Sequence, residues 1–138
     1  MAGWKSVEEI IAYQISVKLR EAILAMANRP PISKDFDFKD QIVSAAASVP
    51  SNIAEGFDLY KHGRFSYHVG VAKASLAELK NHLKDGRERG YFDDITYKDL
   101  EAMRLEAQRT AMGLLKHLKT SEAPDPSWAP KAAKRESR

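Results

Sequence analysis

The sequence predicts an all-α protein, an antiparallel four-helix bundle, and three observations support this. Four segments repeat apolar residues every three or four positions, as a helix with one buried face does. The alternating pattern of Val, Ile and Thr that is typical of strands is absent, and glycine and proline number only 7 and 6 in 138 residues. Each segment has about 25 residues and is therefore about 37 Å long as a helix, so the four can lie side by side.

The first helix is expected between a capping box formed by Ser6 and Glu9 and a stop at 28–31, where two prolines follow each other. Its main apolar stripe comprises Val7, Ile11, Ile15, Leu19, Ala22 and Met26. A second apolar set comprises Ile10, Tyr13, Val17 and Leu24. Two apolar sides predict contact with more than one neighbouring helix.

The other three helices are expected over residues 37–59, 63–89 and 96–119. The apolar stripe of the second comprises Ile42, Ala46, Val49, Ile53 and Phe57. That of the third has coiled-coil spacing and comprises Phe65, Val69, Ala72, Leu76, Leu79 and Leu83. That of the fourth comprises Leu100, Met103, Ala107, Ala111, Leu114 and Leu118.

Local signals set the expected helix ends. Asp85 and Gly86, with Gly90, are expected to end the third helix, and Asp99 is expected to complete a capping box at the start of the fourth. Gly113, inside the fourth helix, is expected to allow a close helix approach, and a kink is the alternative. We interpret residues 1–120 as one bundle domain and residues 121–138, rich in Pro, Lys and Arg, as a disordered tail.

The second helix is poor in charge. Glu55 is the only charged residue between Gln41 and Phe57, whereas the chain average of 30% would place about five there. Opposite the apolar stripe lies a polar strip of Ser44, Ser48, Ser51, Asn52 and Glu55. Either another element or subunit covers this strip as well, or it is simply the wet face of the helix; we favour the covered alternative.

Pro50 stands in the middle of the same helix, where it removes one backbone hydrogen bond. One continuous helix and two shorter helices that break near Ser48 or Val49 are both open. If Glu55 is buried it needs a donor, and Arg64 or a backbone amide is the candidate.

The run from Phe38 to Phe57, with QIVSAAASVPSNIAEGF at its end, and the later run AKASLAEL at 72–79 resemble the signature of the 23S ribosomal RNA intervening-sequence proteins. The resemblance covers about residues 5–119. It implies a left-handed up-down-up-down bundle that assembles into a homopentameric ring. It also implies a structural role, in the motif and at interfaces, for Ser48, Pro50, Asn52, Glu55 and Gly56.

The chain is similar, too, to the accessory variability protein of diversity-generating retroelements, a strongly basic pentameric bundle that works with a reverse transcriptase and nucleic acid. The formal net charge here is only +3. The family name reflects where some of the genes lie, inside ribosomal RNA genes.

No catalytic residues, cofactor or metal site are expected. Cysteine is absent, the four histidines form no i, i+4 pair, and no phosphate-binding glycine motif or nucleophile motif occurs. His62, His68, His82 and His117 are expected to be solvated or capping residues. The start of the chain has no apolar leader and the longest apolar run, 22–27, is too short to span a bilayer. We therefore expect a non-enzymatic cytoplasmic protein without membrane contact.

The clearest electrostatic feature is a set of cations on one side of the third helix: Lys73, Lys80, Lys84 and Arg87. They recur at intervals of 7, 4 and 3 and are a candidate phosphate-tracking stripe for RNA or DNA, while a solvated flank is the alternative. A pI of 9.1 permits nucleic-acid binding. The function that we expect is a self-assembling, nucleic-acid-associated adaptor; the alternative is a scaffold that binds an unidentified protein.

Overall fold

The computed structural model describes residues 3–60 and 63–121. Four long helices pack together: α1 (Ile11–Ala27), α2 (Phe36–Asp58), α3 (Phe65–Glu88) and α4 (Asp94–Ser121). Two short 3₁₀ helices, η1 (Val7–Glu9) and η2 (Ile32–Lys34), precede α1 and α2. The all-α expectation is confirmed, since the described residues contain four such helices and no strand.

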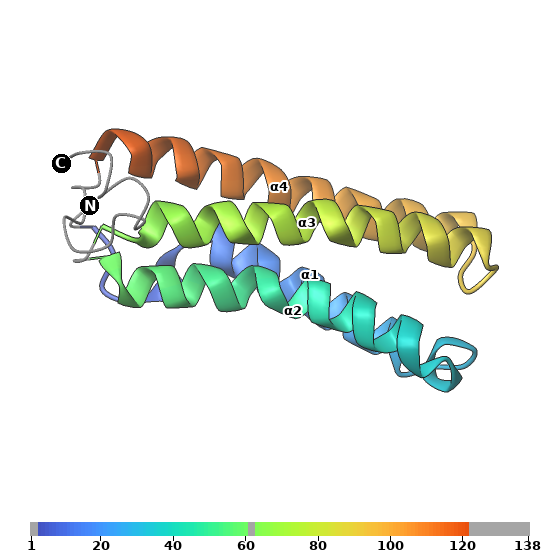
Figure 1. The fold of residues 1–138 in the computed structure, drawn as a ribbon. Helices are drawn as coiled ribbons and strands as arrows, with labels where there is room; N and C mark the ends of the chain where they lie inside the picture. The colour runs from blue at the N-terminus through green and yellow to red at the C-terminus, as the bar shows by residue number, and fades with distance from the viewer. Residues whose placement is uncertain (1–2, 61–62, 122–138) are drawn as a thin grey trace, which may run out of the picture.

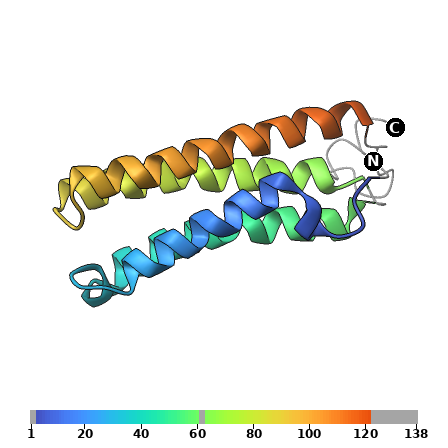
Figure 2. The same cartoon turned by 180° about the vertical axis from the view of Figure 1, so that it is seen from behind.

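The helices lie in a ring of neighbours, because α2 packs on α1 and α3 while α4 packs on α3 and α1. The segments that join α1 to α2 and α3 to α4 lie at one end of the bundle (Figure 1). The start of α1, the end of α2, the start of α3 and the end of α4 lie at the other, as the reverse view also shows (Figure 2). No helix among the described residues is long and apolar enough to cross a membrane.

The core follows the predicted stripes of α2, α3 and α4 closely, but not that of α1. The face that α1 buries runs through Ala12, Ser16, Leu19, Ile23 and Met26, and Ile11 is 58% exposed. Inside α1, each predicted step of four residues turns the stripe by about 40°, so Ile11 and Ile15 lie off the buried face. In front of α1 the backbone of Ile10 is extended (φ −84°, ψ 120°). Val7 belongs to η1 and is therefore out of register with α1. The predicted Ser6–Glu9 capping box is present in front of η1.

The start of α4 differs from the expectation, whereas α3 ends within one residue of the expected position. Helix α4 starts at Asp94, so Asp99 lies inside it; Asp93 caps it by accepting a hydrogen bond from the Thr96 amide at 2.8 Å. That bond is the main reason why the pKa of Asp93 lies below its usual value. Helix α3 continues past Gly86 to Glu88, and Gly90, at φ +76°, follows its end.

Two glycines have roles other than the predicted ones. Gly86 provides room for aromatic rings, because a Cβ there would lie 2.6 Å from Phe92 Cε1 and 2.8 Å from Phe38 Cζ. Gly113 was expected at a close helix approach, and this expectation is wrong: it is exposed and a Cβ would meet no atom within 4 Å.

Trp4 fixes the N-terminal segment to the bundle. Its ring makes edge contacts with Phe65 at the start of α3 (6.3 Å between ring centroids) and with His117 near the end of α4 (5.9 Å). Ser121, the first residue of the predicted tail, is the last residue of α4. The rest of that tail, residues 122–138, lies outside the described part of the chain, and so does His62.

Candidate interfaces on the two flanks of helix α3

Three motif residues of α2, Ser48, Asn52 and Gly56, lie at the contact between α2 and α3. Gly56 is buried, and a Cβ at this position would lie 2.8 Å from both His68 Cβ and Phe65 Cδ1. Real Cβ atoms do not approach so closely, so the two helices can only come this near with glycine at position 56. The glycine of the motif is therefore explained by helix packing inside one chain.

Two turns earlier, small polar side chains join the same two helices. Ser48 Oγ and Ser75 Oγ are 2.8 Å apart and share a hydrogen bond. Asn52 Nδ2 donates to the carbonyl oxygen of Ser48 (2.8 Å) and to its Oγ (3.0 Å). On its other side, Asn52 Oδ1 lies 3.3 Å from His68 Nδ1. The hydrogen-bonded side chains thus form one continuous network, which we call the α2–α3 polar network. Its members are Ser75, Ser48, Asn52 and His68.

His68 was expected to be solvated or capping, and this expectation is wrong. Only 9% of its side chain is exposed. Its Nδ1 also lies 4.0 Å from Glu55 Oε2, and its Nε2 is buried without a hydrogen-bond partner among the described residues. The position of His68 depends on the α2–α3 register, which no pattern local to α3 reveals.

The polar strip of α2 therefore divides in two. Ser48 and Asn52 are half-buried against α3, whereas Ser44, Ser51 and Glu55 are exposed, with 60% of the Glu55 side chain in solvent. Pro50 is buried within one continuous helix, so the alternative of two shorter helices is wrong. Within a single chain, α3 covers half of the strip and the other half remains open.

The opposite flank of α3, beside α4, carries the predicted cations. Lys73, Lys80 and Lys84 are exposed, and no carboxylate of the described residues lies within 4.0 Å of their ammonium groups. We call these three residues the lysine stripe. Arg87 differs: its Nε donates to Asp94 Oδ1 at 2.8 Å, and its guanidinium carbon lies 4.7 Å from the centroid of the Tyr97 ring. The structure thus separates Arg87 from the three unpaired lysines.

The structure also contains a buried arginine on α4 that the sequence patterns did not predict. Arg104 of α4 is only 2% exposed. Its Nε and Nη2 donate to the two carboxylate oxygens of Glu101 at 2.6 and 2.8 Å, and its Nη1 donates to Gln108 Oε1 at 2.8 Å. A weaker contact of 3.4 Å reaches the carbonyl oxygen of Leu76 on α3. A bidentate ion pair therefore occupies the α3–α4 contact.

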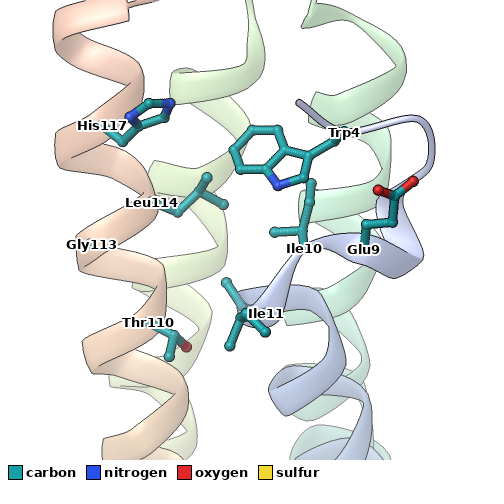
Figure 3. A pocket seen from close by; sticks show the side chains of 9 residues that line it. Trp4, Glu9, Ile10, Ile11, Thr110, Gly113, Leu114 and His117 are labelled. Atoms are coloured by element: carbon teal, nitrogen blue, oxygen red, sulfur yellow. The ribbon is translucent and has the colours of Figure 1, made fainter. Parts of the chain in front are cut away.

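A third feature is an apolar pocket of about 290 Å³ near the start of α1. Figure 3 shows Trp4, Ile10 and Ile11 on one side and Thr110, Leu114 and His117 of α4 on the other. The carboxylate of Glu9 accepts hydrogen bonds from the backbone amides of Lys5 and Ser6. This acid is thus committed to the capping box rather than to chemistry inside the pocket.

Groups of His, Asp and Glu that could hold a metal ion do not occur among residues 3–60 and 63–121. The geometry so far defines a four-helix protein with two distinct surfaces on α3: a polar, tightly packed contact with α2 and an exposed lysine stripe beside α4.

The protein belongs to the family of 23S rRNA-intervening sequence proteins, whose family model matches residues 8–113. The matched region contains both surfaces and most of α4. A comparison with curated proteins gives no match.

Proposed function

We propose that this protein is a non-enzymatic, oligomeric adaptor that binds RNA or DNA through the lysine stripe. The observation that carries the proposal is that Lys73, Lys80 and Lys84 are exposed on one flank of α3 without a carboxylate partner among the described residues. Unpaired ammonium groups are free to neutralise phosphates and to release the counterions condensed on a nucleic acid.

The spacing of the lysines suits a backbone rather than a single anion. Lys73 and Lys84 are eleven positions apart, which is about 16 Å along a helix. Phosphate contacts of this kind give affinity without sequence preference. We therefore expect binding that tolerates many sequences and weakens steeply with salt.

The test is a salt titration of binding to structured RNA, single-stranded RNA and duplex DNA. Replacing Lys73, Lys80 and Lys84 together by Gln is expected to reduce the slope of log affinity against log salt by about 0.7 to 0.9 for each lysine. The matched control replaces three exposed lysines elsewhere, Lys18, Lys34 and Lys116, by Gln, which makes the same change in net charge.

If the two triple variants lose affinity equally, overall charge and not the lysine stripe is responsible. If all three ligands bind more weakly than about 10⁻⁴ M at physiological salt, the adaptor function is wrong. In that case the protein-binding scaffold becomes the better hypothesis.

We further propose that the chain is a left-handed, antiparallel bundle and that copies assemble into a ring-like homopentamer through the outer face of α2 and α3. The support is the exposed part of the polar strip, where Ser44 and Ser51 are small and uncharged and Glu55 is the only charged residue between Gln41 and Phe57. Ala74, a small residue of α3, is exposed as well. Interface cores are depleted of charge in the same way.

Light scattering tests the assembly, which is expected near 78 kDa, about five times the 15.5 kDa chain. Ala74→Arg places a long charged side chain on the proposed interface and is expected to release smaller species. Ala102→Arg is the matched control, because Ala102 is an exposed alanine on α4. A wild-type protein with the mass of one chain would overturn the assembly.

A further inference from the structure

Lys84, the last residue of the lysine stripe, also lines a pocket that the proposed phosphate contacts do not involve. Where α3 ends and α4 begins, a pocket of about 310 Å³ is lined by Lys84, Arg87, Glu88, Asp94 and Tyr97. It lies at the end of the bundle opposite the start of α1 (Figure 1). Its volume is at the lower end of the usual range for small-molecule sites.

A planar cation is held in position within this pocket. Asp94 accepts the hydrogen bond from Arg87 Nε at 2.8 Å, and the guanidinium carbon lies 4.7 Å from the Tyr97 ring centroid. The Arg87 side chain is nevertheless 45% exposed. Because exposed nucleic-acid bases stack on aromatic rings and on guanidinium planes alike, this pair offers a stacking platform.

The charges of the pocket favour a base over a phosphate. Lys84 and Arg87 are balanced by Glu88 and Asp94, so the pocket as a whole does not attract a polyanion. Glu88 is exposed, and no hydrogen bond or ion pair of its carboxylate to a described residue is present, so it is available as an acceptor. Carboxylates of this kind accept from the exocyclic amino group of cytosine.

We propose that this pocket binds an unpaired, amino-bearing base of a single-stranded nucleic acid whose phosphates lie along the lysine stripe. The inference rests on the proposed adaptor function, and it narrows the ligand from nucleic acid in general to single strands. Lys84 belongs to both sites and joins them. A base inside a duplex is stacked between its neighbours and cannot place its face on the Arg87–Tyr97 pair.

The test uses the full-length protein and strands of equal length: oligo(dC), oligo(dT), an abasic deoxyribose-phosphate strand, and an oligo(dC)·oligo(dG) duplex. Oligo(dC) is expected to bind about tenfold more tightly than the abasic strand, the scale of one stacked base. Tyr97→Leu is expected to abolish this difference while binding of the abasic strand is unchanged. Tyr67→Leu is the matched control, since Tyr67 is 46% exposed elsewhere on α3.

Tyr97 is half-buried, so Arg87→Ala provides a second variant that removes the platform if Tyr97→Leu does not fold. Glu88→Ala isolates the hydrogen bond: it is expected to lower the preference for oligo(dC) over oligo(dT) about fivefold. Because both strands carry the same phosphates, this ratio is independent of the change in net charge.

The outcomes separate the two proposals. If the abasic strand or the duplex binds as tightly as oligo(dC), the base pocket is wrong and the adaptor function stands. If no strand binds even at low salt, the adaptor function is wrong and the base pocket falls with it.

Discussion

Helix α3 contacts a helix on either side, and the two contacts are built from opposite chemistry. Toward α2, Gly56 and the α2–α3 polar network join the helices through small, neutral groups. Toward α4, the buried Arg104 forms a bidentate ion pair with Glu101 of the same helix and reaches α3 at the carbonyl oxygen of Leu76 (3.4 Å). A neutral network of small groups depends on close approach of the helices, whereas Arg104 is a long charged side chain that reaches from α4 to the backbone of α3. Ser48, Asn52 and Gly56, which stand in the run that resembles the family's signature, belong to the first kind of contact.

The largest expected effect breaks the charged contact. Arg104→Leu leaves the Glu101 carboxylate, whose side chain is 19% exposed, without its partner. We expect a loss of about 3 to 5 kcal/mol in the free energy of unfolding, measured by chemical denaturation. The double variant Glu101→Leu/Arg104→Leu is the control and is expected to regain most of this loss, because it leaves no unpaired charge. A loss below about 1 kcal/mol for the single variant would mean that the pair behaves as a surface salt bridge.

A smaller effect is expected where the neutral contact is tightest. Gly56→Ala places a Cβ 2.8 Å from two side-chain atoms, and we expect it to lower the free energy of unfolding by about 1 to 2 kcal/mol. Gly70→Ala is the matched control, because a Cβ there meets nothing within 4 Å. It is expected to stabilise the protein by about 0.5 to 1 kcal/mol through helix propensity. Equal effects of the two substitutions would contradict the close approach at Gly56.

The hydrogen bonds of the α2–α3 polar network are expected to contribute less. Asn52→Ala removes the bonds to Ser48 and the contact with His68, and a loss of about 1 kcal/mol is expected by thermal or chemical denaturation. Ser51→Ala changes the neighbouring exposed residue and is expected to stay within about 0.5 kcal/mol of the wild type. If both variants behave alike, the network contributes nothing beyond solvation.

The smallest effect is expected at one end of the α2–α3 contact, where a charged side chain, the Asp35 carboxylate, takes part. Asp35 caps α2 by accepting from the Phe38 amide, and its carboxylate also accepts from the Tyr91 hydroxyl. The bond from Tyr91 is the main reason why the pKa of Asp35 lies below its usual value. The resulting stability is complete above the unfolded pKa of about 3.9 and is lost as the pH falls through the lower folded pKa.

Asp35→Asn keeps a capping oxygen but removes the negative charge that the Tyr91 hydroxyl and Arg89 contact. It is therefore expected to lower the melting temperature by a few degrees at neutral pH, and less in acid. Scanning calorimetry between neutral and acidic pH measures the difference. Asp40→Asn is the control, since Asp40 is an exposed carboxylate on the same helix. A difference from the wild type that persists unchanged into acid would assign the effect to something other than the ionised carboxylate.

The sequence predicts the two contacts unequally well. The α2 side is visible because its residues stand close together: the absence of charge around Asn52 and the glycine at 56 are properties of one short stretch. The burial of Arg104 cannot be predicted from the sequence, because a cation next to an apolar stripe has the same pattern as a surface residue. Only the position of α3 shows that Arg104 is buried. The lysine stripe shows the same limit of sequence-based prediction. Spacing alone groups Arg87 with the three lysines, and only the packing of α3 on the start of α4 shows that Arg87 contacts Asp94 and Tyr97.

The prediction for the start of α1 is wrong for a related reason. Periodicity continues from Val7 to Ile11 as if one helix contained both, but a single extended residue, Ile10, rotates the register between them. Such a break has no signature in the spacing of apolar residues. The buried His68 is missed because its partner lies on another helix.

The position of Trp4 has a practical consequence. The indole is held between the first residue of α3 and a histidine near the end of α4, so its emission reports on whether that end of the molecule is closed. With Trp128 replaced by Phe, Trp4 is the one tryptophan of the chain. Fraying of the last turns of α4 then becomes an optical signal that can be followed without a label.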